Sequence, residues 1–401
     1  MTRAGAGTLK QAEVLKDEIR LLVLCSRINP DENTVFGIRD LAARDICWDS
    51  FVRSAIGQRV FPLVFLNFRN FCADKVPLHV MEKLNGLFIR NTARNMFLLK
   101  ALAGILDGFE KKGIDALPFK GPVLAETVYG DIALRVFTDL DILVAPGDAL
   151  KARDLLLKKG YLADIFLSER QARAYLKKEN FFHLFSPDGR VSIDLHWEMS
   201  GRYCLKPMYL DGVKMVSGVS NALGRSVLTL EPEILLVYLS IHNSSHQWEH
   251  LESVACMSEI IRSSGRLDWE AMVSFAKTYR SKRMLLTGLC LCMRLFDVRL
   301  PDGVSGQIIK DKGLWKVADG LILKLFRARV TSWSWRFSFV HLRIRDHGFD
   351  SLRYGLRLLF LSTVKEWQAF PLTPPFTFLH YALRPLRLAR DAARFFHRHS
   401  L

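Results

Sequence analysis

The chain has 401 residues, of which 49% are apolar and 24% are charged. This composition is too rich in core-forming side chains for a disordered or low-complexity protein, and at roughly 150 residues per domain the length predicts two or three domains. The 57 lysines and arginines exceed the 41 aspartates and glutamates by 16, which favours an anionic partner such as nucleic acid, a nucleoside triphosphate or an acidic membrane surface.

The cysteines argue against a disulfide framework or a zinc ribbon. There are seven, they are scattered, and no two form a Cys-x-x-Cys pair, so a reducing compartment is expected. The segment Met1 to Val14 lacks the apolar stretch of a secretory signal, and prolines interrupt the longest uncharged run, Trp367 to Leu383. The sequence predicts a soluble cytoplasmic protein, or one held peripherally at the inner face of the membrane.

Apolar residues at helical spacing predict a helical N-terminal region over 1–100. The pattern then changes. Residues 114–120 and 137–144 are predicted strands, and a helix over 149–159 follows, capped at its start by Asp148.

Next comes a predicted hairpin, with strands over 181–185 and 191–197 joined by a Pro-Asp-Gly turn. The strands are thus expected to lie between 114 and 198, and helical periodicity returns from Glu231. The predicted fold class is α+β, a small mixed-sheet core within mainly helical N- and C-terminal regions. Its predicted parts are the core over 101–200, a helical domain over 201–312 and a basic helical region over 313–401.

The motif with the clearest functional signal is Thr138-Asp139-Leu140-Asp141, an Asp-x-Asp sequence in a predicted strand. On a strand, Asp139 and Asp141 share one face while Leu140 points to the core. Two neighbouring carboxylates repel unless a cation lies between them, and Mg²⁺, which prefers oxygen ligands, is the usual one. The alternative is a pair of solvated aspartates.

A third carboxylate, Asp194, lies in the strand Ile193-Asp194-Leu195-His196. Its neighbours should face the core, and His196 lies on the same side as Asp194. A carboxylate between two core-facing apolar residues usually has a hydrogen-bonding or charged partner or binds a metal, although it can also lie on a solvated strand end.

Upstream, Lys120-Gly121 ends the first predicted strand and begins a helix. Backbone N–H groups at a helix N-terminus favour phosphate, and Lys120 would add a point charge there. Since a Lys-Gly turn is also common without a ligand, the pair alone does not decide between the two.

Taken together, these motifs resemble the uncharacterised nucleotidyltransferase family of the polymerase-β-like superfamily. The resemblance extends beyond the core to nearly the whole chain. The matching segments are Leu117 to Gly121, Tyr129, Arg135, Thr138 to Val144, Gly160-Tyr161, Ile193 to Trp197, Cys47 to Leu63, His242 to Leu251, Leu267 to Trp269 and Leu383 to Pro385.

The resemblance implies metal-dependent transfer of a nucleoside monophosphate from a nucleoside triphosphate to a hydroxyl of an unknown acceptor, with release of pyrophosphate. Asp139 and Asp141 would bind two Mg²⁺ ions, for which Mn²⁺ could substitute. Asp194 would complete the metal site and help to deprotonate the acceptor. Lys120 and the Gly121 amide would hold phosphate. The further substrate- or phosphate-binding residues would be Arg135, Thr138, His196, His242 and His246.

Two departures from the family pattern keep other functions open. Gly121 is followed by Pro122, which removes an amide donor from the phosphate cradle, and Cys256 stands where relatives tend to carry an aspartate. A non-catalytic scaffold with a basic tail for membrane or nucleic acid is therefore one alternative. A glycosyltransferase that uses its Asp-x-Asp on a nucleotide sugar is another.

His242, His246 and His250 have a spacing that predicts one stripe of a helix. A stripe that lines the nucleotide cleft, simple packing and zinc binding are all consistent with it.

The last fifth of the chain is strongly basic. From Leu314 to Leu401 it contains 15 lysines and arginines against 5 acids. Arginines and aromatic residues alternate from Phe376 to His399, a pattern typical of a helix that lies on anionic lipid or grips a phosphate backbone, or of a solvated helix that packs on the body. The arginines are Arg384, Arg387, Arg390, Arg394 and Arg398.

Overall fold

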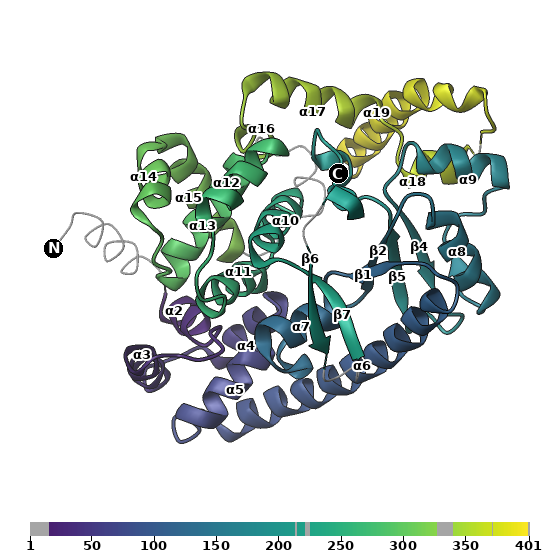
Figure 1. Cartoon of the computed structure of the whole chain (residues 1–401). Coiled ribbons are helices and arrows are strands. Elements are labelled where there is room, and N and C mark those ends of the chain that lie inside the picture. The colour runs from purple at the N-terminus through teal and green to yellow at the C-terminus, as the bar shows by residue number, and fades with distance from the viewer. Residues whose placement is uncertain (1–15, 213–214, 221–224, 327–339, 371, 400–401) are drawn as a thin grey trace.

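The structure, a computed structural model, describes residues 16–212, 215–220, 225–326, 340–370 and 372–399. Helices surround one small mixed sheet, as predicted from the sequence (Figure 1). Buried apolar side chains form two groups: one joins the N-terminal helices to those of the second half, and the other lies between the sheet and its neighbouring helices. Within these ranges no helix combines the length and the apolar character needed to cross a bilayer.

Residues 16–100 of the N-terminal region are mainly helical, as predicted, whereas residues 1–15 of that prediction lie outside the described residues. The longest helix of the region, α6, has 33 residues and buries Leu98, Leu102 and Ile105 at the spacing that places side chains on one helix face. These three residues pack against the sheet, and α6 runs along the lower edge of the molecule in Figure 1. The helices are α2 (Asp17–Leu24), α3 (Glu32–Ala42), α4 (Trp48–Gly57), α5 (Phe61–Phe71) and α6 (Leu78–Glu110).

The central sheet has five strands in the order β1-β2-β5-β4-β3. β2 and β5 are parallel neighbours, and the other pairs are antiparallel. The predicted hairpin is confirmed, because β4 and β5 pair on either side of the Pro-Asp-Gly turn. The strands are β1 (Ala116–Pro118), β2 (Leu140–Val144), β3 (Leu162–Ala163), β4 (Phe181–Phe185) and β5 (Ser192–His196).

The helix predicted over 149–159 is present as α8, but its predicted cap differs. Asp148 occupies the N-cap position with helical backbone angles, φ −96° and ψ −8°, and its side chain accepts no capping hydrogen bond from the described backbone. An N-cap side chain normally reaches the first turn from an extended backbone, which explains the difference. The elements beside the sheet are α7 (Gly121–Tyr129), η1 (Ile132–Leu134), α8 (Ala149–Lys158) and α9 (Glu169–Leu176).

A second hairpin lies outside the segment 114–198 to which the strands were expected to be confined. β6 (Met215–Ser220) pairs with β7 (Arg225–Leu230), and β7 lies beside β1. Beyond it the predicted return to helix is confirmed. The elements are η2 (Gly201–Tyr203), η3 (Leu210–Gly212), α10 (Pro232–Ser245), α11 (Leu251–Ser263), α12 (Trp269–Thr278), α13 (Lys282–Phe296), α14 (Asp302–Lys310) and α15 (Lys312–Phe326).

The C-terminal helices return to the sheet. Trp367 is fully buried, and its ring centroid lies 5.4 Å from that of Tyr175 in an edge-on contact. Lys178 Nζ also donates to the Thr377 carbonyl at 2.6 Å. These contacts tie the end of the chain to the sheet core. The elements are α16 (Val340–Arg343), α17 (Gly348–Phe360), α18 (Val364–Ala369), η4 (Phe376–Leu379) and α19 (His380–His399).

Candidate active site

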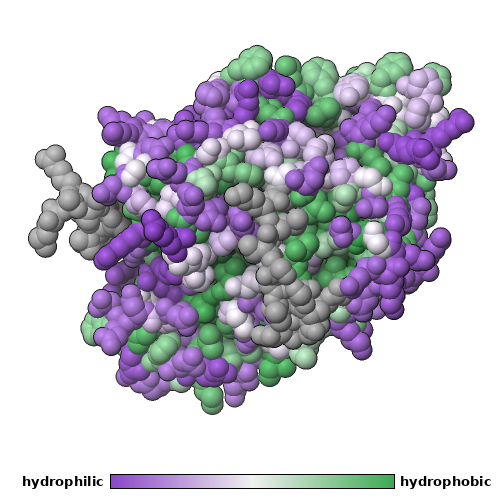
Figure 2. Space-filling view, in the orientation of Figure 1, coloured by the Kyte–Doolittle hydropathy of each residue, from purple (hydrophilic) through white to green (hydrophobic). Residues whose placement is uncertain are grey.

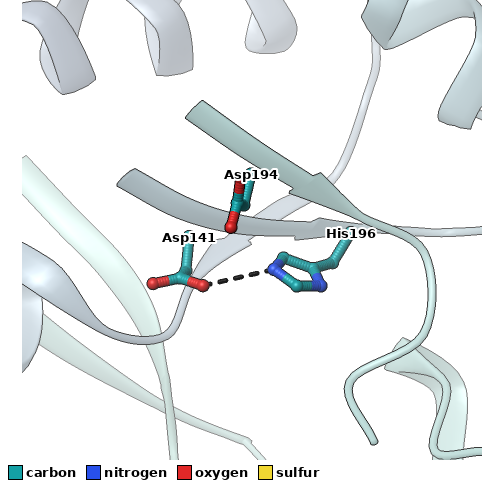
Figure 3. A group of neighbouring side chains, drawn as sticks. All are labelled: Asp141, Asp194 and His196. Atoms are coloured by element: carbon teal, nitrogen blue, oxygen red, sulfur yellow. Dashed lines mark hydrogen bonds and ion pairs between the residues drawn. The ribbon is translucent and has the colours of Figure 1, made fainter. Parts of the chain in front are cut away.

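Two neighbouring strands bring polar side chains together on one face of the sheet. In the parallel pair β2–β5, Asp141 is the register partner of Asp194. Ile193 and Leu195, on either side of Asp194, are fully buried, as predicted. Because alternate residues of a strand share a face, His196 lies on the side of Asp194. One ligand atom from each of Asp141, Asp194 and His196 lies within 4.8 Å of the other two (Figure 3).

Lys120, in the turn between β1 and α7, places a positive charge beside Asp141 in this cluster. Its Nζ lies 2.8 Å from Asp141 Oδ1, and His196 Nε2 lies 3.2 Å from the same oxygen. Burial alone would raise the pKa of Asp141, but the Lys120 ammonium and His196 outweigh it and hold that pKa well below its usual value. Burial would likewise lower the pKa of Lys120, yet the pull of Asp141 raises it. Both groups are therefore charged at neutral pH.

Gly121 begins α7 in a conformation that suits glycine. Its φ is +58°, and a Cβ atom at this position would lie 3.2 Å from the carbonyl oxygen of Asp139. The first turn of α7 therefore approaches the loop before β2 more closely than a larger residue would allow. Pro122 occupies the first turn of the helix, where a missing N–H interrupts no helical hydrogen bond.

Asp139 lies in the loop immediately before β2 rather than within the predicted strand. Burial raises its pKa, and repulsion from Asp141 adds to this, while Lys120 opposes it. Thr138, next to it, is exposed, and its carbonyl accepts a hydrogen bond from Arg94 at 3.4 Å. Asp139 is thus an electrostatic neighbour of the three-residue cluster.

His183 belongs to the site but was missed by reasoning from the sequence. It is the register partner of Asp194 across β4–β5, and its Nδ1 donates to Asp194 Oδ1 at 2.8 Å. This hydrogen bond raises the pKa of His183. Its position could have been found, because Phe182 and Leu184 on either side are apolar and the hairpin turn fixes the register opposite Asp194.

Arg135 points to α11 and not to the three-residue cluster. Its Nε donates to Glu252 Oε1 at 2.8 Å, and the Tyr129 hydroxyl reaches the same oxygen at 3.3 Å. Cys256 adjoins this buried group, and burial raises the pKa of its thiol to about 12, so the thiol is neutral. The ion pair joins the segment before β2 to the helical second half of the chain.

The predicted histidine stripe is only partly present. α10 ends at Ser245, and His250 instead precedes α11 and hydrogen-bonds the Gly57 carbonyl at 3.0 Å. His242 and His246 remain neighbours, with ring centroids 4.8 Å apart. Burial lowers the pKa of His242, and the Lys120 charge lowers it further, so its imidazole is neutral at pH 7.

A column of rings connects these histidines with the site. Phe119 packs edge-on against both His196 and Tyr238, at centroid distances of 5.3 and 5.2 Å. The Tyr238 ring stacks on His242 at 5.9 Å, and Lys120 Nζ lies 5.9 Å from the Tyr238 centroid. Helix α10 therefore supplies the wall of the site opposite the sheet.

The cluster has the donors that a divalent cation needs. Carboxylate oxygens suit Mg²⁺ and Mn²⁺, and imidazole nitrogen suits transition-metal ions. Nε2 of His196 is the ring nitrogen that faces the carboxylates, 3.2 Å from Asp141 Oδ1, and would be the ligand atom, while the buried Nδ1 points away from them (Figure 3). The residues thus fit a cation held by Asp141, Asp194 and His196. Such an ion would compete with Lys120 for the Asp141 carboxylate.

Three comparisons with known proteins were made. A crystal structure of an antigenic nucleotidyltransferase-like protein from Paracoccidioides brasiliensis is 13% identical, and the match covers 53% of this chain and 97% of that one with a TM-score of 0.29. None of the curated proteins compared with the chain matches it. Residues 44–297, more than half of the chain, match the sequence model of the uncharacterised nucleotidyltransferase family. The chain belongs to the uncharacterised nucleotidyltransferase family.

Proposed function

We propose that the protein is a metal-dependent nucleotidyltransferase that moves a nucleoside monophosphate from a nucleoside triphosphate to a hydroxyl group of an acceptor. The observation that carries the proposal is the register pairing of Asp141 with Asp194 on parallel strands, beside the lysine that precedes α7. Membership of the nucleotidyltransferase family supports the same reaction class. The proposal assigns neither the acceptor nor the base of the nucleoside triphosphate.

Asp141, Asp194 and His196 would hold a divalent cation, and Asp139, in the loop before β2, would share in binding a second one. Mg²⁺ is the expected ion, with Mn²⁺ as the substitute. When bound, such ions stabilise the negative charge of the triphosphate and of the leaving pyrophosphate.

The side chains of the protein have three further tasks. Lys120 would turn from Asp141 toward the triphosphate, and the close approach at Gly121 lets the first turn of α7 come near a phosphate. The acceptor oxygen attacks the α-phosphorus, the bond from that phosphorus to the bridging oxygen breaks, and pyrophosphate leaves. Asp194 accepts the hydroxyl proton, held in place by the hydrogen bond from His183.

The outer residues would bind the nucleotide. Thr138 is exposed in the segment before β2, and His242 of α10 and His246 just after α10 lie within the influence of the Lys120 and Asp141 charges. Arg135 would bind phosphate only by leaving its ion pair with Glu252. Burial and the Lys120 charge lower the pKa of both His242 and His246. A neutral imidazole suits base stacking or hydrogen bonding better than phosphate binding, so we assign the two histidines to the nucleoside end.

Isothermal titration with Mg²⁺ and each nucleoside triphosphate tests the proposal. The double substitution Asp139→Ala/Asp141→Ala should abolish the magnesium-dependent heat, and Asp148→Ala, a nearby aspartate without a capping bond to the described helix, serves as the matched control. Equal binding by all three proteins contradicts the proposal. Mass spectrometry of products after incubation with labelled nucleotides and host lysate then identifies the acceptor.

A non-catalytic nucleotide-binding or scaffold role is the second candidate. It is favoured by the buried ion pair between Lys120 and Asp141, whose side chains are 12% and 4% exposed. In this pair the Lys120 ammonium, and not a metal ion, balances the charge of the Asp141 carboxylate. Under this alternative the native protein binds nucleotide but forms no product with any lysate fraction.

A further inference from the structure

Helix α17 turns an apolar stripe toward solvent. Phe349, Leu352, Leu356 and Leu359 are 65%, 59%, 48% and 43% exposed. Their spacing of three, four and three residues places them on one face of the helix. A surface helix of a globular protein normally buries such a stripe.

The opposite face of α17 is polar and buried. Asp350 is fully buried and accepts a hydrogen bond from Arg280 at 2.8 Å. Arg357 donates to the Cys204 carbonyl at 2.6 Å, and Tyr354 packs in the interior. These contacts fix the orientation of α17 about its own axis. The apolar stripe therefore faces solvent because of the internal packing of the helix.

The exposed apolar surface continues beyond α17. Half of the large apolar side chains that are exposed in the described residues lie between positions 342 and 386. Figure 2 shows apolar surface along the upper edge of the molecule, where α17 and α19 lie in Figure 1. We call this the C-terminal apolar surface. Its members are Leu342, Phe349, Leu352, Leu356, Leu359, Phe360, Phe370, Phe376, Phe378, Leu379, Tyr381 and Leu386.

The acids of this region are held within the protein, Asp346 by the backbone N–H groups of Lys282 and Arg283 and the others by arginines. Asp350 pairs with Arg280, and Glu366 pairs with both Arg384 and Arg387. Asp391, the last described acid, pairs with Arg387 at 2.7 Å and, more weakly, with the largely exposed Arg390 at 3.7 Å. Two of the tail arginines predicted to bind a polyanion, Arg384 and Arg387, are therefore occupied by internal acids.

Every exposed charged side chain described between residues 340 and 391 is positive: Arg343, Arg353, Lys365 and Arg390. The surface thus combines large apolar side chains with cations of one sign. Two copies packed face to face would bring these like charges together, which disfavours self-association. Nucleic acid would use the cations but would leave the leucine and phenylalanine stripe in water.

We propose that the C-terminal apolar surface binds an anionic lipid bilayer, with the stripe of α17 in the boundary between headgroups and acyl chains and the four cations on acidic headgroups. This is the arrangement that interfacial helices use, where apolar burial and electrostatic attraction act together. The proposal is independent of the nucleotidyltransferase chemistry, because none of these residues lies in the three-residue cluster.

Co-sedimentation with lipid vesicles tests it on the full chain. The native protein should bind vesicles of equal parts phosphatidylglycerol and phosphatidylcholine, bind pure phosphatidylcholine weakly, and lose binding as salt rises. Leu352→Asp/Leu356→Asp should lower the vesicle-bound to free ratio by about tenfold or more. The matched control is Phe36→Asp/Leu78→Asp, which changes two apolar residues on α3 and α6 that are more exposed than Leu352 and Leu356, and which should bind as the native protein does.

The cations are tested separately by Arg343→Glu/Arg353→Glu, which should weaken binding to the anionic vesicles at low salt and make it less sensitive to salt. Circular dichroism checks that each variant is folded. The proposal is overturned if the native protein does not bind anionic vesicles. It is equally overturned if Leu352→Asp/Leu356→Asp and Phe36→Asp/Leu78→Asp bind these vesicles to the same extent. It is also overturned if light scattering shows a dimer that Leu352→Asp/Leu356→Asp dissociates, or if RNA co-sediments with the protein while vesicles do not.

Discussion

Lys120 Nζ lies 2.8 Å from Asp141 Oδ1, and the two side chains are almost completely buried. The lysine ammonium supplies the positive charge that a divalent cation would otherwise supply to this carboxylate. The site is therefore stable without a metal, and metal binding must displace or share the contact between Lys120 and Asp141.

Replacement of Lys120 by methionine tests this relationship. Lys120→Met leaves the Asp141 carboxylate buried beside only one weaker partner, so the free energy of unfolding should fall by about 3 kcal/mol. Mn²⁺ should raise the melting temperature of the variant more than that of the native protein, because the ion then meets no competing ammonium. A urea titration and thermal unfolding with and without Mn²⁺ measure both effects; equal metal responses would contradict the competition.

Gly121→Ala should disturb the start of α7. A residue with a side chain at φ +58° costs about 1–2 kcal/mol, and the new methyl group would press on the Asp139 carbonyl. The control is Gly306→Ala in α14, where a Cβ atom meets no neighbour within 4 Å and stability should rise by about 0.5–1 kcal/mol. Denaturant midpoints compare the two. Equal effects would mean that the turn tolerates a side chain.

The hydrogen bond between His183 and Asp194 predicts a pH dependence. Because the pKa of His183 is raised above its ordinary 6.5, its contribution to stability is present below pH 6.5 and disappears as the pH rises through the raised value. Asp194→Asn should return the pKa of His183 toward 6.5. NMR titration of the His183 ring measures it, and Asp148→Asn should leave the titration unchanged.

Glu366 gives the opposite dependence in the C-terminal region. Burial alone would raise its pKa, but hydrogen bonds from Thr363 and Arg387 outweigh burial and lower it from 4.5 to about 2. Its contribution is therefore present above pH 4.5 and is lost as the pH falls toward 2. At neutral pH, Glu366→Gln should cost about 2 kcal/mol, and the difference from the native protein should vanish in acid. Unfolding curves across this pH range check the prediction, and a difference that persists at pH 2 would contradict it.

The local pattern of the chain predicted the strand positions of Asp141 and Asp194, but it placed Asp139 on the same strand as Asp141, and the structure has Asp139 in the loop before β2. In Ile193-Asp194-Leu195 the carboxylate alternates with buried apolar residues, and the same holds for Asp141 between Leu140 and Ile142. Strand alternation therefore turns each aspartate away from its buried apolar neighbours, and the parallel register of β2 with β5, which the sequence did not predict, brings both to one face. The same reasoning could have found His183.

Long-range pairing explains most of what the sequence did not predict. Glu252 lies 117 residues from Arg135, and no local pattern links them. The partner of Lys120 was also hidden, because phosphate and carboxylate are equally good counterions for a lysine at a helix start. In α17, helical periodicity predicts an apolar stripe but does not tell which face is buried, and here the buried polar contacts of Asp350 and Arg357 decide it.

The central claim is that Asp141 is required for nucleotidyl transfer, and a product assay tests it directly. Native protein, Asp141→Asn and Asp148→Asn are each incubated with Mg²⁺, labelled nucleoside triphosphates and host lysate, and labelled acceptor and pyrophosphate are measured. We expect transfer by the native protein and by Asp148→Asn, and a loss of about 100-fold or more in folded Asp141→Asn. Equal transfer by Asp141→Asn, or no transfer by the native protein in any lysate fraction, would contradict the claim.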